Sequence, residues 1–240
     1  MVKKLNSLTI FFPCYKDEKS IGKLVRNADA IAKIITDDYE IIVVNDASPD
    51  NALQVLQNLQ GEITRLRIIS HAKNKGYGGA IRSGFDNATK EFVFYTDGDG
   101  QYDVMELPLL TEQMTDSVDV VNGWKIERGD GMARKIIGNV WCTFVKLAFG
   151  IKIKDVDCDF RLIRKKVLDT IELETNTGAI CTEFVKKTQT AGLIFSEVGV
   201  NHYPRMHGSS QFLRSRRILD TFLEEAKLWI RLHRSRQRGQ

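Results

Sequence analysis

Residues 92–103, FVFYTDGDGQYD, join a short apolar run to a dense group of polar side chains. The apolar run at 92–95 predicts a buried β-strand. The polar stretch that follows places oxygen-bearing side chains at Asp97, Asp99 and Gln101. Ligands of open α/β sheets bind beyond the carboxyl ends of the strands. This stretch is therefore a candidate functional site.

Comparable units surround this stretch on both sides. The first 121 residues alternate short apolar runs with amphipathic stretches of helical spacing. Such alternation is typical of βα units arranged around a parallel sheet. The strands predicted in this part of the chain are Leu8–Phe12, Ile41–Val44, Leu66–Ile69, Phe92–Tyr95 and Val118–Val121.

The second half of the chain is less regular. It predicts a helix at Lys135–Phe149, a helix from near Gly178 through Thr182–Thr190, and strands at Phe160–Ile163 and Leu193–Val200. Because no linker or internal repeat separates the halves, we expect a single Rossmann-like α/β sheet, mainly parallel and flanked by helices. The predicted organisation is one domain over residues 1–212, followed by a basic amphipathic helix over 213–240.

The composition narrows the class of protein. The 240 residues are 42% hydrophobic and 28% charged, with four prolines and no low-complexity tract, which excludes a collagen-like or wholly disordered chain. No uncharged stretch approaches the roughly 18 residues that span a bilayer, and the first residues lack a signal-peptide cleavage pattern. The four cysteines are far apart and lack metal-binding spacing. They predict reduced, buried thiols in a cytosolic protein.

The C-terminal stretch carries an excess of positive charge. Residues 212–240 hold eight Arg and Lys against three Asp and Glu, although the net charge of the chain is only +4. Within this stretch, Ile218–His233 has a broad apolar face formed by Leu219, Phe222, Leu223, Ala226, Trp229 and Ile230. Such a helix suits a membrane surface or a partner's transmembrane helices; a solvated end is the alternative. Aromatic residues are not interleaved with the basic ones, so no nucleic-acid partner is expected.

Asp97, Asp99 and Gln101 are candidate metal ligands. Three oxygen donors at alternate positions can converge on one hard cation, and Mg²⁺ or Mn²⁺ completes its shell with water and substrate phosphates. An EF-hand is excluded because Tyr102 stands where that loop requires glycine and Pro108 where it requires glutamate. The stretch NKGYGG (74–79) fits neither a dinucleotide fingerprint nor a P-loop. Strand-end carboxylates with a metal point instead to a nucleoside diphosphate as leaving group.

Five motifs together carry a family resemblance. They are IFFPCYKDE (10–18), EIIVVNDASPD (40–50), TDGDGQYD (96–103), DVDCDFRL (155–162) and YPRMHGSSQF (203–212). In their order and spacing the chain resembles a family 2 inverting glycosyltransferase with the GT-A fold. It is most similar to the branch that moves a sugar from a nucleotide onto a polyprenyl or dolichyl phosphate. The likeness runs from Leu8 to Phe212.

The resemblance implies roles for individual residues. The donor nucleotide would be bound by Pro13, Tyr15, Asp17, Asp46, Lys75, Gly76, Asp97 and Gly98. The cofactor, Mg²⁺ or Mn²⁺, would be held by Asp97, Asp99 and Gln101. The donor and acceptor phosphates would face Lys125, Arg134, Arg161, Arg205 and Ser210. The catalytic group would comprise Asp99, Asp157, Arg134 and Arg205.

Three positions depart from the family pattern. Asn45 stands where Asp is common, Lys125 where Arg is frequent, and Gln211 where Lys often follows Gly-x-Ser. The first departure leaves Asp46 in its role. The other two weaken the predicted hold on the acceptor phosphate, because Lys supplies a point charge and Gln supplies none.

The implied mechanism follows from charge. Departure of a nucleoside diphosphate develops negative charge, which a divalent ion and nearby Arg and Lys would stabilise. A phosphate-ester acceptor has a second pKa of about 6 and is already a nucleophilic anion at pH 7. A hydroxyl acceptor would instead need a carboxylate base, for which Asp157 or Asp159 could serve.

The predicted function is metal-dependent sugar transfer from a UDP- or GDP-sugar to a polyprenyl or dolichyl phosphate. We expect a cytoplasmic protein, peripherally associated with the cytoplasmic face of a membrane. Two alternatives stay open at this point: transfer to a saccharide or protein hydroxyl, and a catalytically silent subunit that binds nucleotide sugars. A small membrane-protein partner and a homo-oligomer are further possibilities for assembly.

Overall fold

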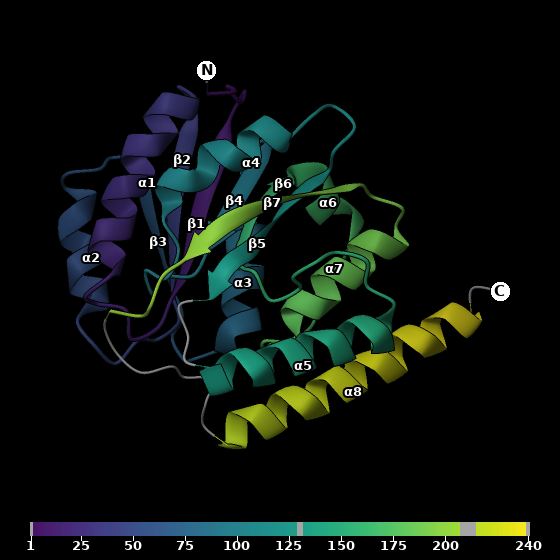
Figure 1. The fold of residues 1–240 in the computed structure, drawn as a ribbon. Helices are drawn as coiled ribbons and strands as arrows, with labels where there is room; N and C mark the ends of the chain where they lie inside the picture. Colours follow the sequence, from purple (N-terminus) through teal and green to yellow (C-terminus); the bar gives the residue numbers. More distant parts are fainter. Residues whose placement is uncertain (1, 129–131, 207–214, 239–240) are drawn as a thin grey trace.

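A single seven-stranded sheet organises the computed structural model, which describes residues 2–128, 132–206 and 215–238. The sheet order is β3-β2-β1-β4-β6-β5-β7 (Figure 1). Strand β6 pairs antiparallel with β4 and β5, and the other recorded pairings are parallel. The strands are β1 (Leu8–Cys14), β2 (Tyr39–Asn45), β3 (Leu66–Ser70), β4 (Phe92–Thr96), β5 (Val120–Arg128), β6 (Phe160–Arg164) and β7 (Phe195–His202). The predicted mainly parallel α/β sheet, shared by both halves of the chain, is confirmed.

Helices cover both faces of the sheet. One face packs against α1 (Ile21–Ile35), α2 (Ala52–Gln60), the short 3-10 helix η1 (Val104–Glu106) and α4 (Leu107–Gln113). The opposite face packs against α3 (Gly76–Asn87), α5 (Met132–Phe149), α6 (Lys165–Thr170), α7 (Ile180–Thr190) and α8 (Ser215–Arg238). The result is a three-layer molecule with a hydrophobic core on each side of the sheet.

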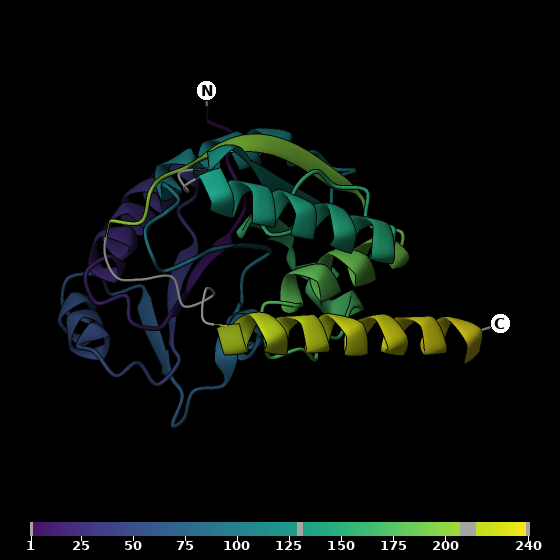
Figure 2. The same cartoon turned by 60° about the horizontal axis from the view of Figure 1, so that its bottom comes forward.

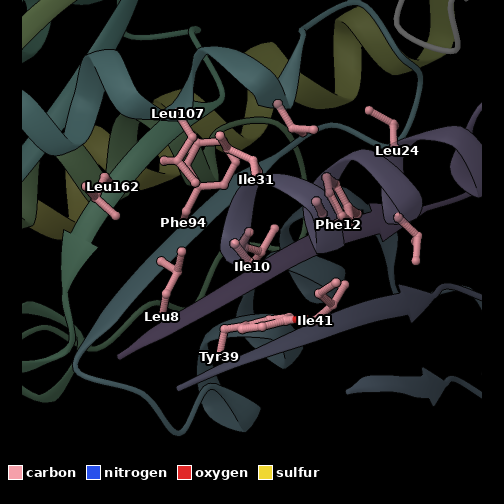
Figure 3. Packing of buried hydrophobic residues seen from close by; sticks show 14 of the residues in the cluster. Leu8, Ile10, Phe12, Leu24, Ile31, Tyr39, Ile41, Phe94, Leu107 and Leu162 are labelled. Carbon is pink, nitrogen blue, oxygen red and sulfur yellow. The ribbon is translucent and has the colours of Figure 1, made fainter. Parts of the chain in front are cut away.

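Strand β1 shows how the sequence builds these two cores. Because side chains alternate across a strand, Leu8, Ile10 and Phe12 enter the core beneath α1, whereas Phe11 enters the core on the α3 side. Helix α1 presents its apolar stripe, including Leu24 and Ile31, to the first of these cores (Figure 3). Full burial of a side chain of this size contributes about 1.5–3 kcal/mol.

The topology brings the polar strand ends to one edge. The carboxyl ends of β1, β2, β3 and β4 meet there because these strands are parallel. The antiparallel strand β6 brings its beginning to the same edge, with Phe160 opposite Thr96. Residues that precede β6, among them Asp159, therefore lie next to the residues that follow β4.

Two strands begin later and extend further than predicted. Strand β5 starts at Val120 and continues beyond Val121, because its ladder with β7 includes Trp124 opposite Gly199 and Lys125 opposite Val200. Strand β7 correspondingly runs to His202. The search for apolar runs misses these extensions because polar residues and a glycine interrupt the added stretches.

Helices α5 and α8 run alongside each other in Figure 1, and their side chains are in contact. In Figure 2, α8 (yellow) extends beyond the other helices toward the C-terminus. The Trp141 and Phe222 rings are 4.2 Å apart, and Trp229 Nε1 donates to the Ala148 carbonyl at 3.0 Å. The predicted amphipathic helix at 218–233 is confirmed within α8. Among the described residues, no helix is both long and apolar enough to cross a bilayer.

The apolar face predicted for α8 contacts α5 through Phe222 and Trp229 but stays partly exposed, whereas another face of the helix is buried. Glu225 and Leu228 are buried, whereas Phe222, Leu223, Trp229 and Ile230 are 41–51% exposed. Helix α5 continues this apolar surface with Val140, Phe144 and Leu147, which are 56–79% exposed. We call these seven side chains the α5–α8 surface.

Candidate active site

A cavity of about 310 Å³ lies at the sheet edge where the polar strand ends meet. Its lining comes from the ends of β1, β2 and β4, the start of α3, the loop before α7, and α8. Nine of the predicted site residues line it: Pro13, Tyr15, Asp17, Asp46, Gly76, Asp97, Gly98, Asp99 and Arg205. The sheet edge predicted from the motifs is therefore the place where they meet.

Asp46, at the end of β2, organises the glycine-rich turn. Its carboxylate is 2% exposed and accepts hydrogen bonds from the backbone N–H groups of Lys75 (2.7 Å) and Gly76 (3.0 Å). His71 Nδ1 lies 2.6 Å from the same carboxylate. Gly76 has a φ of +80°, and a Cβ there would lie 2.5 Å from the Asn176 carbonyl, so the turn requires glycine. Lys75 contributes its backbone N–H here and does not line the cavity.

The β1 end packs directly against the β4 end. A Cβ on Gly98 would lie 2.6 Å from the Pro13 carbonyl, so only glycine allows this approach. Asp17 accepts the Tyr15 N–H at 3.0 Å. Burial raises the pKa of Asp17 to about 7, and the nearby Asp99 charge adds to this, although the Tyr15 hydrogen bond and the Arg205 charge oppose it.

Asp97 and Asp99 follow β4 and line the cavity. Tyr77, in the first turn of α3, donates its hydroxyl to Asp97 Oδ1 at 2.7 Å. Asp99 Oδ2 forms an ion pair with the Arg205 guanidinium, and Asp99 Oδ1 accepts the Gln101 N–H at 2.9 Å. Burial raises the pKa of Asp97 well above its ordinary value, and the charges of Asp159 and Asp99 raise it further.

This donor set fits a hard divalent cation. The lining carries the carboxylates of Asp17, Asp46, Asp97 and Asp99 against the single guanidinium of Arg205, among the residues that the structure describes. Carboxylate oxygens are the ligands that Mg²⁺ and Mn²⁺ prefer. A cation between Asp97 and Asp99 would also compensate the charge that raises the pKa of Asp97.

Gln101 holds a neighbouring segment in place. Its side chain is buried, and Nε2 donates to the Tyr203 carbonyl at 3.1 Å. The Tyr203 N–H donates back to the Gln101 carbonyl at 2.8 Å. These two bonds fix the segment that carries Arg205 over Asp99. Gln101 does not line the cavity, and its role as a metal ligand stays a prediction.

The prediction that Arg161 faces a substrate phosphate is wrong, because the side chain is not accessible to a ligand. Its side chain is fully buried under the site. Nε donates to Asn122 Oδ1 at 2.6 Å, and the other two nitrogens donate to the Tyr95 hydroxyl (2.6 Å) and the Val156 carbonyl. The same network reaches Asp159, whose carboxylate lies 3.7 Å from the guanidinium. Arg161 therefore supports the site from below as a structural cation.

Lys125 and Asp157 are not among the residues that line the cavity, and their predicted contact with substrate stays a prediction. The Lys125 ammonium pairs with Asp155 Oδ2 at 3.2 Å and donates to the Asp157 carbonyl at 2.8 Å. Asp155, Asp157 and Cys142 have the spacing of a metal site. The Lys125 ammonium already supplies the positive charge beside Asp155, so this group behaves as an ion-pair network.

Two predicted phosphate-binding residues are not tested by the structure. Ser210 lies outside the described residues, and so does the side chain of Arg134, although its backbone lies in the first turn of α5. The predicted buried thiols are confirmed, since Cys14, Cys142, Cys158 and Cys181 are all buried and free of disulfides.

Sequence reasoning missed several cavity residues. Tyr77 follows the recognised Gly76, and its hydroxyl reaches Asp97 only through the start of α3. The loop before α7 adds Asn176, Thr177 and Gly178, and α8 adds Thr221. The Asn-Thr-Gly run ahead of a helix is a turn signal that could have drawn attention to that loop. Nothing in the sequence near Thr221 indicates that α8 reaches the site.

The fold and the site define a GT-A type of protein, and comparisons with known proteins agree. The sequence profile of glycosyl transferase family 2 matches residues 9–172. The chain belongs to this family. Crystal structures of glucosyl-3-phosphoglycerate synthase from Mycobacterium tuberculosis superpose on 92% of this chain and 80% of their own. The complex with phosphoglyceric acid has a TM-score of 0.71, and the complex with Mn²⁺, UDP and glucosyl-3-phosphoglycerate has 0.70. At 14% identity they confirm the predicted GT-A fold and nothing further.

Curated relatives narrow the resemblance. The undecaprenyl-phosphate 4-deoxy-4-formamido-L-arabinose transferase of Yersinia enterocolitica is 27% identical over 216 residues, covering 88% of this chain and 64% of that protein. The dodecaprenyl-phosphate galacturonate synthase of Rhizobium johnstonii is 28% identical over 213 residues, covering 87% and 62%. The chain thus spans less than two thirds of the length of these relatives. The predicted similarity to polyprenyl-phosphate sugar transferases is confirmed.

Proposed function

We propose that this protein is a metal-dependent inverting glycosyltransferase that moves a sugar from a UDP- or GDP-sugar to a polyprenyl phosphate. One observation carries the proposal: Asp97 and Asp99 share a cavity with Arg205 and with the glycine turn held by Asp46. Family membership and the names of the relatives support this reading.

Asp97 and Asp99 would hold Mg²⁺ or Mn²⁺, with Gln101 as the predicted third ligand. The ion, when bound, supplies positive charge to the departing diphosphate. Without a cation, the carboxylate-rich lining would repel a diphosphate. Binding of the nucleotide sugar would therefore require the metal ion.

Arg205 is placed to bind a phosphate beside this ion. Its side chain reaches Asp99, yet Nε has no hydrogen-bond partner in the described part of the chain. A planar guanidinium can hold a phosphate oxygen with one edge while it remains near a carboxylate with the other. Asp46 and the Gly76 turn would hold the nucleoside at the opposite wall.

The acceptor fits a phosphate better than a hydroxyl. A phosphate monoester is already an anion at pH 7, so no side chain has to remove a proton from it. Asp157, the predicted base, is not among the residues that line the cavity. Asp159 is buried, where its carboxylate accepts hydrogen bonds from the Tyr95 hydroxyl (3.1 Å) and from Cys181 Sγ (3.2 Å). It is therefore a poor candidate for collecting a proton from solvent.

The α5–α8 surface would bring the site to a membrane. Its members are 41–79% exposed, and the sequence adds arginines at both ends of α8. Apolar side chains on an interfacial helix enter the boundary between headgroups and acyl chains, and each nearby arginine contributes about 1 kcal/mol on anionic lipid. Thr221 of α8 lines the cavity, and the next residue, Phe222, belongs to this surface, so the two lie close together. A peripheral position on the cytoplasmic face, as predicted, completes the proposal.

The test combines binding with turnover. Thermal shifts with a panel of UDP- and GDP-sugars plus Mn²⁺ identify the donor, because a ligand at 100 times its dissociation constant adds about 2.7 kcal/mol of stability. The chosen donor is then incubated with polyprenyl phosphate. Formation of a lipid-linked sugar supports the proposal. Transfer to a saccharide hydroxyl alone would favour the first alternative, and binding without transfer to any acceptor would favour a silent subunit.

A further inference from the structure

The loop between α6 and α7 forms one wall of the cavity through Asn176, Thr177 and Gly178. The Gly78 N–H donates to the Asn176 carbonyl at 3.0 Å, and Arg82 donates to the Asn176 side chain. The loop is therefore hydrogen-bonded to the first turns of α3, where Gly76 and Tyr77 also line the cavity.

Glu183, near the start of α7, anchors the other side of this loop. Its side chain is fully buried. Oε2 accepts the backbone N–H groups of Glu174 at 3.1 Å and Thr175 at 2.9 Å, immediately before Asn176. One carboxylate thus fixes the backbone that leads into the cavity wall.

Two cations lie beside this carboxylate. Lys187 Nζ lies 2.8 Å from Glu183 Oε1 and also donates to the Glu172 carbonyl. Burial alone would raise the pKa of Glu183, but the hydrogen bonds from Lys187 and Thr175 hold it below its ordinary value. Arg231 of α8 supplies the second cation, with NH2 placed 3.3 Å from Glu183 Oε1.

Arg231 joins α8 to the same loop at two points. Besides Glu183, its guanidinium contacts Glu174 Oε2 at 3.2 Å. Six residues earlier on α8, Glu225 accepts a hydrogen bond from the Thr182 hydroxyl at 2.7 Å. Arg231, Glu225 and the lining residue Thr221 therefore follow one another along the side of α8 that meets α7 and the cavity.

We propose that Glu183 and Arg231 form a clamp that positions the 174–178 wall for binding of the donor nucleotide, so that donor affinity depends on the seating of α8. Glu183 is a positioning residue: it holds the loop backbone and does not line the cavity. Arg231 strengthens this hold from the C-terminal helix. The inference rests on the proposed function, because it names a determinant of donor binding at that site.

Arg231→Gln is the primary test, since Arg231 is partly exposed and its loss leaves Lys187 beside Glu183. Lys227→Gln is the matched control, because Lys227 lies one turn earlier on α8 and pairs only with Glu224 among the recorded contacts. The probes are UDP and GDP with Mn²⁺, followed by calorimetry. A partly exposed pair predicts a dissociation constant raised about threefold in Arg231→Gln, with no change in Lys227→Gln.

Two further readouts separate positioning from general destabilisation. Hydrogen exchange at the amides of Glu174 and Thr175 should accelerate in Arg231→Gln while the exchange of the β1 and β4 amides stays unchanged. In turnover, the donor KM should rise and kcat at saturating donor should not, because the wall binds ground state and transition state alike.

A double-mutant cycle tests whether Arg231 acts through Glu183. Glu183→Gln keeps an oxygen acceptor for the loop backbone but removes the charge that attracts Arg231. In the Glu183→Gln background, Arg231→Gln should therefore raise the dissociation constant by little more than Glu183→Gln alone does. Fully additive effects, or nucleotide affinity and loop exchange unchanged in folded Arg231→Gln, would overturn the clamp. If wild-type protein binds neither UDP nor GDP with Mn²⁺, the proposed function itself fails, which is a distinguishable result.

Discussion

The sheet edge and the α5–α8 surface are built on opposite principles. At the sheet edge, Asp46, Asp97 and Asp99 are held by hydrogen bonds from backbone and side chains, and all are largely removed from solvent. On the α5–α8 surface, Phe144 and Leu147 are 56% and 79% exposed. A set of restrained charges suits binding and catalysis, whereas an exposed apolar surface suits attachment.

The cavity residues and the exposed apolar residues belong to different regions, so a substitution can address one region without the other. Substitutions at the sheet edge should abolish transfer to every acceptor. Substitutions on the α5–α8 surface should affect only an acceptor that resides in a membrane.

The largest effect is expected for Asp99→Asn. The substitution keeps the shape of the side chain but removes a charged ligand, so turnover should fall by about a thousandfold on long-chain and short soluble acceptors alike. Thermal melting should show a folded protein. Asp116→Asn, at an exposed turn, is the control and should retain activity. Near-normal turnover of Asp99→Asn, or of wild type in excess EDTA, would contradict a metal role for this residue.

Arg205→Gln should cause the next largest loss. A glutamine can donate to a phosphate but carries no charge, so turnover should fall by about a hundredfold. Arg205→Lys should restore part of the rate, because it returns the charge without the planar fork. Steady-state rates with saturating metal measure both variants. Equal rates for Arg205→Gln and wild type would place the phosphates elsewhere in the cavity.

The double variant Phe144→Ser with Leu147→Ser addresses the second region. Loss of two partly exposed apolar side chains should weaken binding to anionic vesicles by about thirtyfold. Transfer to a long-chain polyprenyl phosphate in vesicles should fall in parallel, and transfer to a short soluble prenyl phosphate should not.

The control for this double variant is Ile34→Ser, since Ile34 is 46% exposed on α1. Point substitutions are preferred to removal of α8, because removal would also take Thr221 from the cavity. Equal losses of transfer to soluble and to membrane acceptors would contradict the claim that the α5–α8 surface serves only membrane acceptors.

The smallest effect concerns pH and the docking of α8. Burial raises the pKa of Glu225 to about 8, and the charges of Asp157 and Glu183 add to this, against the hydrogen bond from Thr182. The docked helix therefore keeps a proton that an undocked Glu225 releases near its ordinary pKa of 4.5. As the pH rises between these values, docking must weaken.

Limited proteolysis within α8 measures this dependence. Cleavage of wild type should accelerate about tenfold between pH 6 and pH 9. Glu225→Gln retains an acceptor for Thr182 and cannot ionise, so its cleavage rate should depend on pH only as the protease does. If wild type and Glu225→Gln showed the same pH dependence, ionisation of Glu225 would not control the docking of α8.

Much of the sheet edge could be predicted from sequence because its determinants are local. A strand followed by Asp-Gly-Asp, or by Asn-Asp in a turn, places carboxylates at a strand end whatever the rest of the fold does. Nine of the predicted residues accordingly meet in the cavity. The amphipathic pattern of α8 was predictable for the same reason, since it repeats with the helical period.

The remaining features depend on contacts between distant segments. The motif that contains Arg161 gave no sign that Tyr95 and Asn122 would enclose its guanidinium. Lys125 pairs with Asp155 only because β5 lies beside the loop before β6. The predicted apolar face of α8 was correct, but which face would pack on the body was set by the docking of Glu225 and Leu228 against other elements.

The central claim is transfer to a phosphate acceptor, and one competition measures it directly. Wild-type protein, Mn²⁺ and the identified donor sugar are incubated with equal amounts of a polyprenyl phosphate and the corresponding polyprenol in the same vesicles, and the products are resolved by mass spectrometry. The account predicts a sugar on the polyprenyl phosphate only, with one nucleoside diphosphate released for each product and none formed by Asp99→Asn. A sugar on the polyprenol, or a phosphate-linked product that forms equally well with Asp99→Asn, would contradict it.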